Sequence, residues 1–269
     1  MTWVFPRPNF TGDPIEGSTF LITAMSAPAT EMPAGAFPPT HWSVVFTAGH
    51  GGSTDAADAL ADLCRTYWYP LYAFARREGH PPEEAQDLTQ GFFEHLIETH
   101  LVGAADEARG KFRTFLLRCF RHHIASEYAR SGRRKRGGGW PLVSLDAGDG
   151  EARFAREVAD RRDPKTLYER NWAVALVNAA LDGLAQEFER SGRGRVFETL
   201  SPFLHGDPDS PPQVAVAREL ATTEATVRVM VHRLRRRYRE LLRQRVAQTV
   251  GSPAEVEEEL RHLMRVLQR

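Results

Sequence analysis

The stretch that decides the fold is Thr223–Arg243, which reads TEATVRVMVHRLRRRYRELLR. Its apolar residues recur at intervals of three and four, the spacing of a helix with one buried stripe. They are Val227, Met230, Val231, Leu234, Tyr238, Leu241 and Leu242. Thr223 is predicted to cap this helix, and Glu224 in its first turn suits the positive end of the helix dipole.

A shorter helix is predicted just before it. The dipeptide Pro211-Pro212 suits a helix start, and the apolar residues Val214, Val216, Ala217 and Leu220 follow it. A short helix, a break of about three residues and a long basic helix predict a helix-turn-helix. Residues expected to contact DNA are Thr223, Ala225, Thr226, Arg228, Val229, His232, Arg233 and Arg236, and Arg235, Arg237 and Arg239 would also lie within reach of phosphates.

The charge of this region favours DNA binding. Gln213–Gln248 carries nine Arg against three Glu, a net charge of +6, in a chain whose 35 basic and 35 acidic residues balance. A basic surface attracts nucleic acid, although an Arg-rich helix can also be no more than a solvated face.

Composition excludes several other classes of protein. The 269 residues include only Cys64 and Cys119, without a CxxC motif, so we expect no disulfide scaffold, no metal site and no cofactor. No apolar run approaches the ~18 residues of a membrane span. The start of the chain also lacks the basic residues of a signal peptide. A cytoplasmic protein without a membrane partner is expected.

Helical periodicity extends over most of the chain and predicts an all-α protein of two small helical domains joined by a flexible linker. Proline-rich residues 1–40 are expected to be a disordered leader, with Met25 as an alternative translation start. The predicted domains are 41–130 and 164–250, with a flexible basic linker at 131–163 and an amphipathic helix at 251–269. Within them, helices are expected at 55–78, 83–98, 111–130, 164–189, 195–204 and 253–267, with Gly79 ending the first and Pro70 marking a kink or junction in it. Asp163 is predicted to cap the helix at 164–189, with Pro164 in its first turn. Ser252 and Glu255 have capping-box spacing before the last helix, whose apolar side would be formed by Val256, Leu260, Leu263 and Leu267.

The first domain has opposite charges in its two halves. Asp55–Glu107 carries 11 acidic residues against three basic ones, a net charge of −8, and Lys111–Arg136 carries nine basic residues against one acidic residue, a net charge of +8. The acidic half suits a basic protein partner, and the basic half suits a nucleic acid.

Three segments resemble bacterial RNA polymerase sigma factors of the extracytoplasmic-function type. Glu84–Phe93 (EAQDLTQGFF) resembles the segment that binds the β′ coiled coil of core polymerase. Phe112–Arg130 resembles the helix that captures and melts the −10 promoter element. Val214–Leu242 resembles the module that reads the −35 element and contacts the β flap. The resemblance implies core RNA polymerase and promoter DNA as partners, allows an anti-sigma or other regulatory protein, and implies no catalysis.

The resemblance also assigns site residues. Asp87, Gln90 and Phe93 would contact core polymerase, Phe93 as a core or interface anchor. The −10 residues would be Arg113, Arg118, Arg121, His122, Ser126, Tyr128 and Arg130. In such a site, unpaired bases stack on exposed aromatic rings and cations hold the DNA backbone. The aromatic residues Phe112, Phe115 and Phe120 are more simply explained as core.

The sequence departs from the family pattern at three positions. His122 and Ser126 replace the usual Asn and Asp, so the −10 base preference does not carry over. Ala221 replaces the usual glycine of the turn, which is tolerable unless the backbone there adopts a positive φ.

Two other functions stay open. One is a helix-turn-helix regulator that acts without core polymerase. The other is an enzyme with a metal-binding bundle that uses Glu94, His95 and Glu98, although no matching ExxH pair supplies further ligands.

Overall fold

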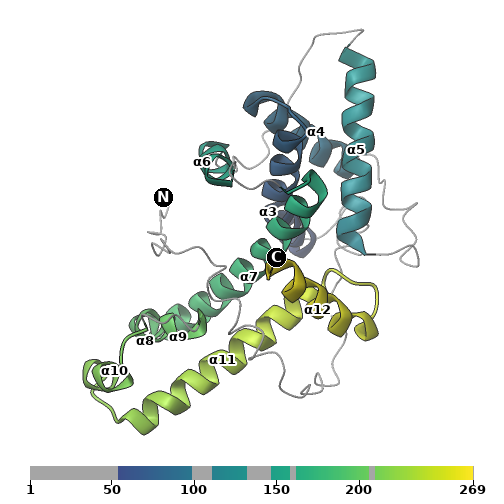
Figure 1. The fold of residues 1–269 in the computed structure, drawn as a ribbon. Coiled ribbons are helices and arrows are strands. Elements are labelled where there is room, and N and C mark those ends of the chain that lie inside the picture. Colours follow the sequence, from purple (N-terminus) through teal and green to yellow (C-terminus); the bar gives the residue numbers. More distant parts are fainter. Residues whose placement is uncertain (1–53, 99–110, 132–146, 158–161, 206–209, 269) are drawn as a thin grey trace. The chain divides into compact units, whose positions relative to one another are not determined.

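The computed structural model describes residues 54–98, 111–131, 147–157, 162–205 and 210–268. All the regular secondary structure within these ranges is helical (Figure 1). The helices are α3 (Thr54–Arg77), α4 (Pro82–Glu98), α5 (Phe112–Ser131), α6 (Ala147–Glu157), α7 (Pro164–Arg190), α8 (Gly194–Leu200), α9 (Pro202–His205), α10 (Gln213–Glu219), α11 (Glu224–Ala247) and α12 (Val256–Leu267), with a 3₁₀ turn at Pro253–Glu255. The predicted all-α class is confirmed for this part of the chain. The predicted leader, 1–40, lies outside the described residues.

The chain divides into two compact units. Among the described residues, the larger unit holds 54–180 and Leu242–Val266, and the smaller unit holds Leu181–Leu241 with 267–268. The boundaries therefore fall inside α7 and α11 rather than at the predicted linker. Most of α12, predicted as an amphipathic helix at 251–269 outside both domains, belongs to the larger unit.

The core of the larger unit is aromatic. Phe120 of α5 meets Phe74 of α3 and Phe92 of α4 edge to face, with ring centroids 6.2 and 5.2 Å apart, and Phe112 meets Tyr67 at 5.5 Å. Phe112 and Phe120 are fully buried, as the core interpretation predicted, whereas Phe115 is only half-buried. Each buried aromatic side chain contributes about 1.5–3 kcal/mol, so these rings fix how α5 lies on α3 and α4.

The end of α3 shows why a glycine stands at position 79. Gly79 has a φ of +101°, and the amide of His80 donates to the carbonyl of Ala75 at 3.2 Å. This is the C-terminal motif that a residue in the left-handed region makes possible. The predicted helix end at Gly79 is confirmed, and Pro70 lies inside a helix that continues past it.

Part of the predicted linker is an ordered helix. The prediction of a flexible segment across 131–163 is wrong for α6, which docks on α3, whereas 132–146 and 158–161 lie outside the described residues. Glu151 accepts hydrogen bonds from Arg76 at 2.9 and 2.8 Å and from the Tyr72 hydroxyl at 2.5 Å. Gly150 lies so close to Trp68 that a Cβ there would stand 3.1 Å from the indole. The local composition of 131–163 could not predict these contacts, because the partner residues lie far away in the sequence.

α7 begins as predicted. The carboxylate of Asp163 accepts hydrogen bonds from the amides of Lys165 and Thr166, both at 3.1 Å, so Asp163 caps the helix and Pro164 occupies its first turn. The predicted short helix at 195–204 is instead two pieces, α8 and α9. Pro202 opens the second piece, because a proline suits the first turn of a helix and not its interior.

α12 has its predicted stripe buried, with Val256, Leu260, Leu263 and Leu267 all at most 5% exposed. The predicted capping box before it is wrong in part. Ser252 makes no side-chain capping bond, although Glu255 accepts a hydrogen bond from the amide of Gly251 at 3.3 Å. In the described part of the chain, no helix combines the length and the apolar character needed to span a membrane.

Candidate nucleic-acid interface

The helix-turn-helix forms where it was predicted, between α10 and α11. Ala221 adopts a φ of +48°. The amide of Ala221 donates to the carbonyl of Arg218 at 3.2 Å, and the amide of Thr222 donates to the carbonyl of Ala217 at 2.8 Å. This is the same left-handed ending as that of α3. The turn is therefore strained, because a Cβ in this region costs about 1–2 kcal/mol.

Thr223 caps α11 as predicted. Its hydroxyl accepts a hydrogen bond from the amide of Thr226 at 3.2 Å and lies 2.9 Å from the Thr226 hydroxyl. A threonine cap of this kind stabilises a helix by about 1 kcal/mol. The cap fixes where α11 begins and hence which residues of its first turns face outward.

One face of α11 is exposed, and it carries the predicted DNA-contacting residues. Val227, Val231, Leu234 and Tyr238 are buried on the opposite side within the smaller unit. The exposed residues are Ala225, Thr226, Arg228, Val229, His232, Arg233 and Arg236, with Thr223 exposed just before the helix. Val229 is 49% exposed, a large apolar side chain on an otherwise polar surface.

Two arginines of α11 serve the fold instead. Arg235 donates to the carbonyl of Phe203 at 3.1 and 2.9 Å. Phe203 lies in the four-residue helix α9, and the last carbonyls of a helix lack helical partners. Arg237 pairs with Glu187 at 2.6 Å and with Glu240 at 3.1 Å. The hydrogen bond from Arg237 lowers the pKa of the Glu187 carboxyl.

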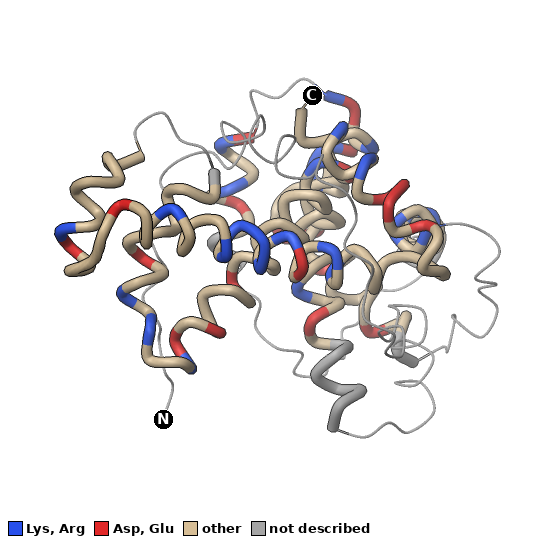
Figure 2. The backbone as a smooth tube through the Cα atoms, turned by 90° about the horizontal axis from the view of Figure 1, so that it is seen from below, with Lys and Arg blue, Asp and Glu red and all other residues tan. Residues whose placement is uncertain are grey.

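Three more arginines of α11 are half-buried: Arg239 donates to the carbonyl of Arg235 at 3.3 Å, and Arg243 and Arg245 pair with Glu257 and Asp62. The other cations of α11 face solvent. Among the described residues, Arg228, His232 and Arg233 have no ion-pair or hydrogen-bond partner, and Arg236 is 63% exposed although it pairs with Glu240 at 3.1 Å. Figure 2 shows basic residues recurring along the helical parts of the chain. The structure thus divides the arginine run into groups that could meet a phosphate and groups committed to internal contacts.

In the larger unit, α5 presents a second basic face. Arg118, Arg121 and His122 are exposed, at positions i, i+3 and i+4 on one side of the helix. The Arg121 guanidinium also lies 5.1 Å from the centroid of the Phe74 ring. Ser126 is half-buried, and Arg130 lies within the helix, although the orientation of its side chain is outside the described part of the structure.

Tyr128 on α5 is 53% exposed and held by two residues that sequence reasoning missed. Its hydroxyl lies 2.9 Å from Nδ1 of His80 and donates to Glu84 at 3.0 Å. Burial and the nearby Glu84 carboxylate raise the pKa of Tyr128. A local pattern could not reveal this contact, because His80 and Glu84 are more than 40 positions away.

The residues predicted to bind core polymerase differ in how deeply they are buried. Asp87 is exposed on α4, and Gln90 is half-buried and donates to Glu94 at 3.1 Å. Phe93 is 1% exposed and lies 5.7 Å from Phe92, centroid to centroid. Of the two predicted roles for Phe93, core or interface anchor, the structure places it in the core.

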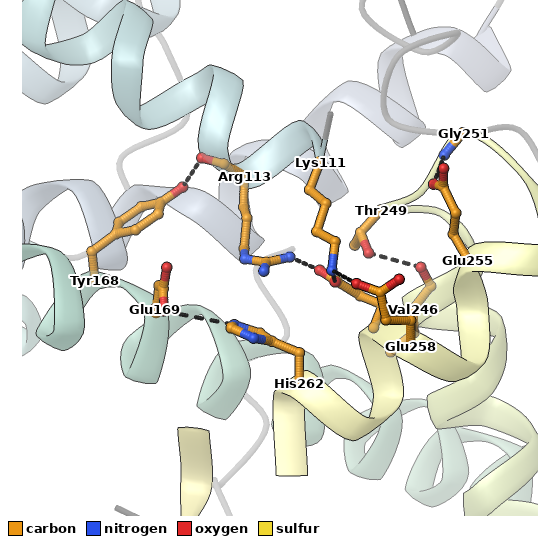
Figure 3. Close-up of polar contacts among 11 residues, drawn as sticks. Lys111, Arg113, Tyr168, Glu169, Val246, Thr249, Gly251, Glu255, Glu258 and His262 are labelled. Atoms are coloured by element: carbon orange, nitrogen blue, oxygen red, sulfur yellow. Dashed lines mark hydrogen bonds and ion pairs between the residues drawn. The ribbon is translucent and has the colours of Figure 1, made fainter. Parts of the chain in front are cut away.

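Arg113 does not lie on the exposed face of α5. It is 4% exposed and forms an ion pair with Glu259 of α12, which is fully buried. Its guanidinium lies 4.5 Å from the centroid of the Trp172 ring, and the Tyr168 hydroxyl donates to its carbonyl at 2.9 Å. Burial lowers the pKa of Arg113. Figure 3 shows Arg113 pointing into this cluster, so the structure does not bring it together with Arg118 and Arg121.

The described residues offer no group of three or more His, Cys, Asp and Glu side chains placed to hold a metal ion. Comparison of the chain with protein-family models, with curated proteins and with solved structures finds no match.

Proposed function

We propose that this protein is a sigma factor of the extracytoplasmic-function type, which binds core RNA polymerase in the cytoplasm and directs promoter recognition and opening without catalysis of its own. The observation that carries the proposal is the exposed face of α11. It follows a capped turn and carries Arg228, His232 and Arg233 without internal partners among the described residues.

This face has the properties of a helix that reads duplex DNA. Small and short side chains at Ala225 and Thr226 let the start of α11 approach base edges, and Val229 could contact a thymine methyl group. Arg233 and Arg236 lie one and two turns further along, where cations meet phosphates. The proposed target of this face is the −35 element.

α5 supports the second half of the proposal, which is capture of the melted −10 strand. Single-strand binding combines cations that follow the backbone with aromatic rings on which bases stack. Arg118 and Arg121 supply the cations, and Tyr128 supplies an exposed ring. Binding of unpaired bases would offset part of the free energy of strand separation.

The acidic surface of α4 is the proposed contact with core polymerase. Asp87 is exposed there, and Glu83 is exposed in the first turn of the same helix. Complementary charge would orient it toward the basic coiled coil of β′. By the same resemblance, an anti-sigma protein is a candidate regulator.

Transcription in vitro tests the proposal. Core polymerase with and without the protein is supplied with a library of genomic DNA fragments, and the transcript starts are sequenced. We expect starts that depend on the protein and share sequence about 10 and 35 base pairs upstream. Unchanged transcription, with no binding of the protein to core polymerase, would contradict the proposal.

A helix-turn-helix regulator that acts without polymerase is the second candidate, favoured by the capped turn and exposed face of α11 alone. Replacing Asp87 with Arg separates the two functions. A sigma factor should lose affinity for core polymerase and keep its affinity for duplex DNA, whereas a regulator should show neither core binding nor any effect of the change.

A further inference from the structure

The C-terminal helix α12 uses three consecutive glutamates to hold three basic side chains of the larger unit. Glu257 pairs with Arg243, at the end of α11. Glu258 accepts a hydrogen bond from Lys111 at 3.0 Å, and Glu259 lies 2.7 Å from the same ammonium group. Glu259 also pairs with the buried guanidinium of Arg113. One turn further on, His262 lies 3.6 Å from Glu169 of α7 (Figure 3).

These contacts differ in depth, which separates their roles. The Glu258 side chain is 65% exposed and that of Glu259 is fully buried. An exposed ion pair contributes little, because water screens it. Removal of one partner of a buried pair instead leaves an isolated charge in a medium that solvates it poorly. Among these contacts of α12, the pair between Glu259 and Arg113 therefore constrains α5 most.

α12 is not built to detach. Leu260, Leu263 and Met264 are at most 8% exposed, and exposing them to water would be strongly unfavourable. A release of Lys111 and Arg113 to bind DNA would require that exposure. Glu257, Glu258 and Glu259 are thus better explained as a permanent brace, which holds the basic side chains in place, than as a cover that leaves to let Lys111 and Arg113 bind DNA.

The brace acts together with the buried rings of Phe112 and Phe120 to set how α5 is rotated. At 3.6 residues per turn, Arg118 and His122 point about 140° and 180° away from Arg113 around the helix axis. Holding Arg113 inward against Trp172 and Glu259 therefore turns Arg118 and His122 outward.

We infer that Glu259 is a positioning residue, which acts through Arg113 to fix the rotation of α5 and so presents the Arg118–His122 face to a single DNA strand. The inference rests on the proposed function for the DNA-binding role of that face. It removes Arg113 from the residues proposed to contact DNA and assigns it to the brace.

The adjacent glutamate provides a matched control. Glu258→Gln and Glu259→Gln change the net charge equally, at neighbouring positions that both pair with Lys111. Any general electrostatic effect on DNA binding should therefore be common to both. Binding of holoenzyme to a fork DNA is measured at several salt concentrations. The unpaired strand of this DNA is the −10 region of a promoter found by the transcription experiment. The temperature is kept below the unfolding temperature of each variant.

We expect Glu259→Gln to bind this DNA at least about fivefold more weakly than Glu258→Gln, since a charge-assisted contact is lost. The slope of log affinity against log salt should be the same for both. A variant that loses a phosphate contact, Arg118→Ala, should instead lower the slope by about 0.7. Equal affinities for the two glutamine variants would overturn the inference, as would a reduced slope for Arg113→Met.

Amide hydrogen exchange separates failure of this inference from failure of the proposed function. If wild-type protein supports no transcription, the proposed function fails, and the brace is still tested by exchange over residues 112–119. Faster exchange in Glu259→Gln but not in Glu258→Gln supports the brace, and equal exchange contradicts it. If Glu259→Gln does not fold, Glu259→Asp takes its place, with the same expected direction.

Discussion

Arg233 and Arg235 lie two positions apart on α11, yet their surroundings differ. Arg233 is exposed and has no partner among the described residues, whereas Arg235 donates two hydrogen bonds to the carbonyl of Phe203. Burial lowers the pKa of Arg235, and its bonds to a neutral carbonyl show that it stays a donor within the fold. Arginine thus serves two purposes in one helix: Arg233 is available to DNA, and Arg235 stabilises the fold.

A pair of alanine variants tests this division. Arg233→Ala should weaken promoter binding and reduce its salt slope by about 0.9, while leaving the free energy of unfolding unchanged. Arg235→Ala should lower the free energy of unfolding by about 1 kcal/mol, because the Phe203 carbonyl loses its donor. Urea titration and DNA binding in a salt series measure the two effects. The reverse pattern would show that the roles have been exchanged.

Ala221 is the position where one substitution should stabilise the protein. Its φ of +48° lies in the left-handed region, which favours glycine and strains alanine. Ala221→Gly relieves strain of about 1–2 kcal/mol and adds unfolded-state entropy worth about 0.4–1 kcal/mol, so a net gain of about 0.5–1 kcal/mol is expected. The midpoint of urea unfolding measures it. As a control, Ala225→Gly, within the first turns of α11, should destabilise, and a loss of stability in Ala221→Gly would contradict the argument.

Among the elements, α6 is held to α3 by a compact set of polar contacts. Arg76 binds both carboxylate oxygens of Glu151, and the Arg153 guanidinium lies 3.7 Å from the centroid of the Tyr69 ring. The hydrogen bond from Arg76 lowers the pKa of Glu151. The residues on α3 that receive α6 are mainly aromatic.

Removing Glu151 should loosen α6 selectively. Glu151→Ala should speed amide exchange in residues 147–157 and lower the free energy of unfolding by about 1 kcal/mol, the size expected for a partly exposed pair. Arg156→Ala, an exposed change on the same helix, controls for helix propensity. Equal exchange in the two variants would show that the contacts of Glu151 do not hold α6.

Local sequence patterns predicted most helices because their causes are local. Asp163 and Thr223 were identifiable as caps, and Gly79 as a helix end, since each acts within a few residues. α6 was missed because Gly and Asp residues near 147–150 resemble a linker, and its stabilising partners lie on α3. The burial of Arg113 was missed for the same reason, since its partner Glu259 is 146 positions away.

At the scale of the whole molecule, several carboxylates have lowered pKa values. Glu151 and Glu187 accept hydrogen bonds from Arg76 and Arg237, and the His262 ring, 3.6 Å away, lowers the pKa of Glu169. Asp163 is stabilised as an anion by the side chain and amide of Thr166. In each case folding favours the charged form relative to the unfolded chain.

These lowered pKa values set the direction in which the stability of the protein depends on pH. A carboxyl whose pKa is lower in the folded state contributes its stability fully above the unfolded value, which is 4.5 for Glu, and loses it as the pH falls through the folded value. The free energy of unfolding should therefore vary little between pH 7 and about pH 5 from these groups and fall below about pH 4.5. Urea titrations at a series of pH values measure this. A stability that rises between pH 5 and pH 3 would contradict it.

The indole of Trp172 lies fully buried beside the Arg113 guanidinium, with the His262 ring 6.3 Å away, centroid to centroid. It is therefore an intrinsic optical reporter. As long as the last helix stays in place, this chromophore is shielded from water and emits at short wavelength, and loss of that helix alone would shift its emission to the red. The difference spectrum between wild type and Trp172→Phe isolates this signal, so undocking of the chain's end could be followed in real time without a dye.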